Sequence, residues 1–166
     1  MWIRILPPSL TLSQHSRDPT LVVEPIRAIR AWRAARQQDG RVFLWSTVMN
    51  MSAPWPIGKW FFARTHTSPF GDDHPAPRAG CNCGVHALKY PMALVRQFGF
   101  SLYVLGEVDL AGRVLEHRGG YRAERAKVAG VYVWTRPSVY TDEVLERILR
   151  MAQGAAATYD VPLSYM

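Results

Sequence analysis

Apolar and polar residues alternate along much of this chain, as they do in β-strands that bury one face. The alternation is clearest over residues 101–117, and two further strands are expected over Tyr121–Lys127 and Val128–Trp134, with glycines interrupting these runs. Glycine within a strand marks a bulge or a point of tight curvature. Consecutive strands of this kind are typical of a small, strongly curved and partly closed β-barrel.

The first half of the chain contains three further segments that favour strands. Residues 21–36 fit either a helical or an alternating period, and the Asp39–Gly40 pair that follows them is a strong hairpin signal. We therefore expect a strand over residues 21–36, a turn, and a second strand over Arg41–Thr47. The aromatic run Lys59–Thr65 predicts a third strand.

Two segments favour helices. Thr141–Gln153 repeats apolar residues at helical spacing, Thr141 can cap its first turn, and Gly154 is placed to end it. Gly84–Phe98 has the same spacing over a shorter length, and Pro91 divides it into one or two short helices.

These elements together predict an α+β fold: the curved barrel, a C-terminal helix, and one or two short helices. A chain of 166 residues is long enough for one domain with its own core. We expect residues 1–20, which are rich in proline, to form a loosely ordered N-terminal arm. Residues 21–154 are then the single domain, and residues 155–166 a C-terminal tail.

Composition and charge narrow the classes of function. The chain has 20 Lys and Arg residues against 13 Asp and Glu, a formal net charge of +7, which favours polyanionic partners such as nucleic acid. Nearly all of these cations are arginines, which GC-rich coding also produces, so charge alone does not establish such a partner. No apolar run approaches the ~20 residues of a membrane span, and the N-terminus lacks the apolar core of a signal peptide. We therefore expect a cytoplasmic protein with no membrane partner.

One stretch of the chain holds both cysteines and two of the five histidines: His74, Cys81, Cys83 and His86. Thiolate sulfur and imidazole nitrogen are typical ligands of tetrahedral zinc, so these four residues are the candidate metal ligands and zinc is the candidate cofactor. Zinc sites usually place about two to four residues between paired cysteines, so a Cys-x-Cys pair reaches one ion only if Asn82 bulges outward. The alternatives are a cysteine nucleophile activated by a histidine, and a pair of small buried side chains that line a turn.

Two motifs resemble those of a known family. The Cys-x-Cys-Gly motif at residues 81–84, the Gly-Tyr-Arg-Ala-Glu motif at residues 120–124, and shorter matches within residues 25–130 resemble a family of uncharacterised proteins from actinobacteria and their phages. The resemblance implies a shared small domain and a bacterial or phage source. It transfers no activity and no catalytic residue.

Candidate binding residues gather around the second of these motifs. Arginines contact phosphate and aromatic rings stack on bases, and the residues suited to these roles are Arg113, Arg118, Tyr121, Arg122, Arg125 and Trp60. We therefore expect a binding module for nucleic acid or a nucleotide-like anion, acting as a phage or bacterial regulatory protein. The alternative is a factor that binds a host protein, since exposed Trp, Tyr and Arg also dominate protein interfaces. A Cys/His-dependent enzyme is a third hypothesis, although the sequence supplies no complete catalytic set at recognisable spacing.

Overall fold

A computed structural model describes residues 19–47, 53–64, 73–91, 103–133 and 141–166 of the chain. These residues contain seven strands and one helix. In chain order they are β1 (Thr20–Arg36), β2 (Val42–Ser46), β3 (Phe61–Phe62), β4 (Val85–Leu88), β5 (Tyr103–Glu116), β6 (Gly120–Val133), α2 (Asp142–Tyr159) and β7 (Leu163–Tyr165).

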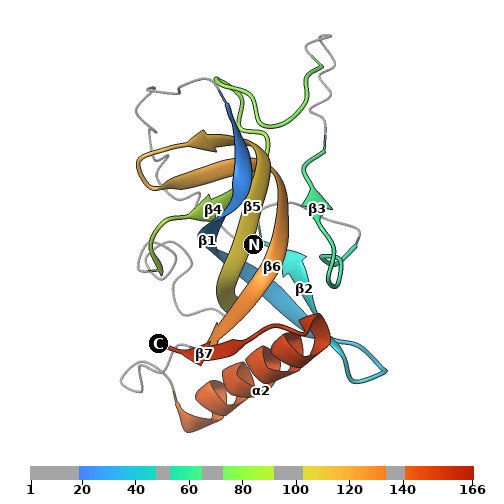
Figure 1. Cartoon of the computed structure of the whole chain (residues 1–166). Helices are drawn as coiled ribbons and strands as arrows, with labels where there is room; N and C mark the ends of the chain where they lie inside the picture. The colour runs from blue at the N-terminus through green and yellow to red at the C-terminus, as the bar shows by residue number, and fades with distance from the viewer. Residues whose placement is uncertain (1–18, 48–52, 65–72, 92–102, 134–140) are drawn as a thin grey trace, which may run out of the picture.

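Four of the strands are joined edge to edge in a ring. β1 pairs antiparallel with β5, β5 with β6, β6 with β4, and β4 with β1 through Ile29 and Leu88. The three long strands β1, β5 and β6 curve strongly as they run around the molecule (Figure 1). β2 pairs with β1 and extends the sheet. β3 and β7 pair with β6 along the same edge of that strand as β4. The expected α+β class, with strands predominating, is confirmed.

The strands expected from the alternating pattern are present, with shifted ends. Residues 21–36 form β1, and the hairpin turn to β2 contains the expected Asp39–Gly40 pair. Within the described residues the run over 101–117 forms the single long strand β5. The two strands expected over Tyr121–Lys127 and Val128–Trp134 are instead one continuous strand, β6, and its pairing with β5 shifts register between Ala111 and Val114, where a glycine lies. Of the described part of the expected strand Lys59–Thr65, residues 59–64, Phe61 and Phe62 are paired as β3.

A tryptophan cluster fills the centre of the fold. Trp32 of β1 is fully buried, and its ring meets that of Trp55 edge-on with 5.5 Å between centroids. The ring of Phe61 stacks on that of Trp55, with 4.8 Å between the ring centroids. α2 lies across one end of the strands (Figure 1), where the Tyr159 hydroxyl donates to the Trp55 carbonyl at 2.9 Å and accepts from the Leu44 N–H at 3.1 Å.

The expected end of this helix at Gly154 was wrong, because the helix continues to Tyr159 and is capped by Asp160 in a left-handed conformation. Gly154 does not end the helix but allows it to pack closely against the sheet. A Cβ at this position would lie 2.5 Å from Cγ2 of Val42 in β2, so only glycine lets the helix approach the sheet here. The residues beyond Gly154, expected to be a tail, form the last turn of α2 and the strand β7.

The short helix expected at the start of Gly84–Phe98 was also wrong. Val85–Leu88 forms β4, whose four residues pair with β6 and alternate between buried and half-buried, because backbone pairing with a long neighbour outweighs weak local helical spacing. Residues 92–98 of that segment lie outside the described residues, as do residues 1–18 of the expected N-terminal arm. In the part of the chain that the structure describes, no helix has the length and hydropathy that a membrane crossing requires.

Candidate metal centre

The loop of residues 73–84, here called the thiol loop, leads directly into β4 and carries three of the four predicted metal ligands. Its turn is closed by a hydrogen bond from the Cys81 N–H to the Arg78 carbonyl at 3.3 Å. Gly84 ends the loop with φ of +113°, a conformation that other residues rarely adopt. Between the two half-buried cysteines Asn82 is exposed, as the outward bulge expected there requires.

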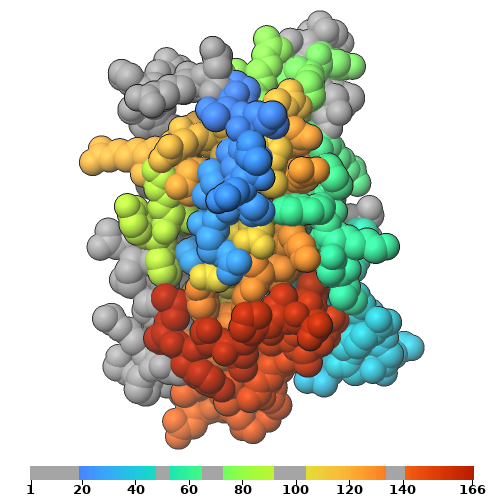
Figure 2. Space-filling view, in the orientation of Figure 1, coloured from blue at the N-terminus to red at the C-terminus, as the bar shows by residue number. Residues whose placement is uncertain are grey.

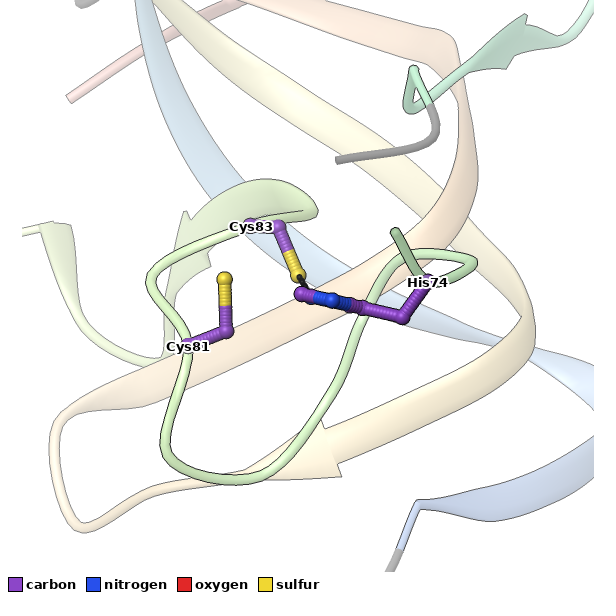
Figure 3. A group of neighbouring side chains, drawn as sticks. All are labelled: His74, Cys81 and Cys83. Atoms are coloured by element: carbon purple, nitrogen blue, oxygen red, sulfur yellow. Dashed lines mark hydrogen bonds between the residues drawn. The ribbon is translucent and has the colours of Figure 1, made fainter. Parts of the chain in front are cut away.

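The loop brings His74, Cys81 and Cys83 together. Their ligand atoms all lie within 4.8 Å of one another, and Nε2 of His74 is 3.4 Å from Sγ of Cys83. Figure 3 shows the two cysteine side chains and the imidazole directed into the same space within the loop. A tetrahedral zinc ion with ordinary bond lengths spaces its sulfur and nitrogen ligands about 3.5–3.8 Å apart. The observed grouping, with all ligand atoms within 4.8 Å, is therefore close to the spacing of a ligand set.

His86, the fourth predicted ligand, lies outside this group. Its Nε2 is 3.0 Å from the Asn82 carbonyl oxygen, which can only accept, so Nε2 carries the proton and supports the thiol loop from β4. Burial lowers the pKa of His86, and the nearby positive charges of Arg30 and Arg122 lower it further. His86 is thus a neutral hydrogen-bond donor to the loop backbone.

The two thiols differ in acidity. Burial acts to raise the pKa of Cys81, but hydrogen bonds with Cys83 and His74 outweigh it, so the pKa of Cys81 is lowered overall. Burial and the hydrogen bond with Cys81 raise the pKa of Cys83. Cys81 therefore ionises first and Cys83 keeps its proton longer. Such a pair can bind a soft metal ion, and an ionised Cys81 also has the property that a nucleophilic thiol needs.

Two arginines predicted to contact phosphate instead support the thiol loop. Arg122 is buried, with Nε donating to Nε2 of His117 at 2.9 Å and Nη1 donating to the Cys83 carbonyl at 3.3 Å. Arg113 donates to the Ala76 carbonyl at 3.2 Å and forms an ion pair with Glu124 at 3.1 Å. The loop is thereby fixed to β6 on one side and to β5 on the other.

The other predicted binding residues fall in two places. Arg118 lies exposed in the turn between β5 and β6, and the nearby ring of Tyr121 is half-buried with Nζ of Lys89 5.2 Å from its centroid. Trp60 and Arg125 meet at β3, where the guanidinium lies 5.2 Å from the indole centroid. The structure therefore does not gather the six predicted residues into one site.

Sequence reasoning missed two side chains that the structure places in these sites. Arg78 lies in the thiol loop with Nη1 3.3 Å from Nδ1 of His74, and only the tertiary turn brings the two together. Phe62 flanks Arg125 beside Trp60, with 5.9 Å from the guanidinium to its ring centroid. The spacing of Trp60 and Phe62, two residues apart in an expected strand, was a signal that both share one face.

Comparison with known proteins leaves the site to be interpreted from its own chemistry. No protein-family model, no curated protein and no solved structure matches the chain.

Proposed function

We propose that this protein is a binding module for nucleic acid or a nucleotide-like anion, and that its thiol loop holds one zinc ion. The convergence of the His74, Cys81 and Cys83 ligand atoms within 4.8 Å is the observation that carries the metal assignment. Two thiolates and an imidazole form a soft donor set that favours zinc over magnesium or calcium. Three protein ligands leave the fourth position of a tetrahedral ion to water.

The neighbours of the three ligands indicate what must change when a metal binds and what favours it. A guanidinium can only donate, so Arg78 donates to Nδ1 of His74, and Nε2 carries the proton that points toward Cys83. To bind a metal through Nε2, the imidazole must move this proton to Nδ1 and release the exposed Arg78. The positive charge of Arg122 beside Cys81 and Cys83 favours the thiolates that the ion requires.

A zinc ion here would act on stability through the thiol loop. It would tie the start of the loop at His74 to its end at Cys83, in a segment that Arg113 and Arg122 already fix to the sheet. Because an unfolded chain does not hold these ligands together, the binding free energy of the ion becomes folding free energy. We therefore expect a bound ion to stabilise the loop against β4, β5 and β6.

Metal stoichiometry of the full chain, purified without chelator, tests this site. We expect about one zinc per chain in the wild type and loss of zinc in His74→Gln, Cys81→Ser and Cys83→Ser. His86→Gln is the matched control, because His86 is the neighbouring histidine whose ring contacts the Asn82 carbonyl instead of the group. Substoichiometric zinc in the wild type, or equal loss in the His86 variant, would overturn the assignment.

The surplus of positive charge supports the binding role of the module. The chain carries a formal net charge of +7, and Arg118 is exposed in the turn between β5 and β6. A polyanion bound by such cations releases counterions, so its affinity must fall steeply as salt rises. Anisotropy of a labelled oligonucleotide titrated with the protein at low and high salt is the test. Salt-independent binding, or no binding at low salt, would contradict this role and favour a protein partner.

A further inference from the structure

We propose that the outer face of β3 and the adjoining part of β6 is a binding site for single-stranded nucleic acid. This inference rests on the proposed role of the protein in nucleic-acid recognition and gives that role a location and a ligand class. The residues of this face, here called the aromatic face, are Trp60, Phe62, Arg64, Arg125 and Lys127, and the exposed Lys59 lies at its edge. The segment that carries β3, teal in Figure 2, lies at the surface along one side of the molecule.

The pairing of β3 with β6 separates an inner from an outer set of side chains. Phe61 pairs with the fully buried Ala126 and stacks on Trp55 inside the fold. Since neighbouring side chains of a strand point to opposite faces, Phe62 and its partner Arg125 face outward. Trp60 is two residues from Phe62 and shares this outer side.

The outer aromatic rings are positioned by Arg125 and remain accessible. Its guanidinium lies 5.2 Å from the Trp60 centroid and 5.9 Å from the Phe62 centroid, so one cation orients both rings. Phe62 is nevertheless 55% exposed, which is costly for a phenylalanine ring unless another surface covers it. Two rings and a planar guanidinium present flat surfaces on which unpaired bases can stack.

The charge of the aromatic face favours a polyanion over an apolar partner. Lys59 and Arg64 are exposed, and Lys127 and Arg125 are half-buried beside them. Within the described ranges none of these four cations lies at salt-bridge distance from a carboxylate.

The neighbouring carboxylates are already engaged elsewhere. Glu124 is held by Arg113 at 3.1 Å, and Asp109 is held by Arg27 at 2.7 Å. Exposed rings beside cations that form no salt bridge are the combination that single-strand binding proteins use for bases and phosphates together. A duplex buries its base faces, so it can use only the cations.

The experiment measures binding of a fluorescein-labelled oligothymidine 12-mer by anisotropy, with a hairpin duplex of equal charge as comparison. We expect the single strand to bind more tightly, and Phe62→Ala to weaken its binding about 5- to 140-fold, the effect of losing one stacked base. Tyr165→Ala is the matched control, because Tyr165 is also an exposed aromatic, 61%, on a short strand paired with β6. Circular dichroism of each variant reports whether the fold is retained.

Salt titration counts the phosphates that the face contacts. Four cations on a single strand predict a slope of about −2.8 in log K against log salt, or about a 50-fold loss from 50 to 200 mM. Lys127→Gln should reduce the slope to about −2.1, and Arg41→Gln, at the distant β1–β2 turn, should leave it unchanged. Arg41 is an exposed cation outside the aromatic face, and it is paired with Asp39 at 2.7 Å.

The outcomes separate the two proposals. If the wild type binds neither oligonucleotide, nucleic-acid recognition itself is refuted. If it binds but folded Phe62→Ala binds as tightly as Tyr165→Ala, or duplex binds as tightly as single strand, the location and ligand class proposed here are overturned. Zinc is measured in the same samples, so that the metal assignment is tested separately from both binding results.

Discussion

The affinity of the thiol loop for zinc should depend on pH through the two cysteines. A thiol must lose its proton to become a metal ligand, so each protonated cysteine makes the affinity rise tenfold per pH unit. At a pH where both thiols are protonated, the slope of log K against pH should approach about 2. The lowered pKa of Cys81 makes its contribution fall first as pH rises, while the raised pKa of Cys83 preserves the second. Between pH 6.5 and 8 the slope should therefore fall as pH rises, and Cys81 should account for the first part of the fall.

Removing one thiol makes this expectation specific. In Cys81→Ser one thiol ligand remains, so the slope of log K against pH should be about 1 over the whole pH range. The zinc affinity of this variant then rises about tenfold per pH unit, whereas that of the wild type rises nearly a hundredfold per unit at the lowest pH. Competition with a chromophoric zinc chelator of known pH dependence provides the affinities, and His86→Gln should reproduce the wild-type slope. A wild-type slope of 1 or less at pH 6.5, or one that Cys81→Ser leaves unchanged, would show that the cysteines do not bind the ion as a pair.

Three further predictions concern the scaffold of this site. Burial lowers the pKa of His86 and of His117 in the folded state below the pKa of about 6.5 that a histidine has in the unfolded chain. At a pH between the folded and unfolded pKa values the folded state binds fewer protons than the unfolded state, so stability falls as the pH drops below about 6.5. Urea midpoints between pH 5 and 7.5 should show this loss, and replacing either histidine with Gln should flatten it; an unchanged profile would refute the assignment. Trp55→Ala should lower the free energy of unfolding by ~3–5 kcal/mol, because the Trp55 side chain is only 1% exposed and its removal leaves a cavity in the core. A loss below ~1 kcal/mol in urea unfolding would contradict the packing described. Gly154→Ala should destabilise the protein although alanine favours a helix by about 1 kcal/mol, because its Cβ would meet the buried Val42; a higher melting temperature in the variant would refute this.

The strands could be predicted from the sequence because their signal is local. Alternation, the Asp39–Gly40 turn and the interrupting glycines indicated β1, β2, β5 and β6 without knowledge of their partners. The end of α2 and the conformation of Val85–Leu88 depended on contacts with distant strands. Gly154 looked like a helix stop because its role, contact with Val42, is visible only in three dimensions.

The candidate site was predictable in composition but not in geometry. The grouping of His74 with both cysteines could be predicted because the three residues are close in the sequence. The position of His86 depended on which way its side chain points from β4, and this ring contacts the Asn82 carbonyl instead of the group. The identity of the two residues as arginines did not indicate that Arg122 would be buried against the thiol loop while Arg118 remained exposed. A long side chain with five donors suits both roles, and only tertiary structure distinguishes them.

X-ray absorption at the zinc edge of the full-length protein tests the metal centre most directly. The structure places two sulfurs and one imidazole nitrogen in the ligand group. The expected spectrum therefore has two sulfur neighbours at about 2.3 Å, with nitrogen and oxygen neighbours at about 2.0–2.1 Å. A first shell with one sulfur or none would show that the thiol loop does not hold the ion as proposed.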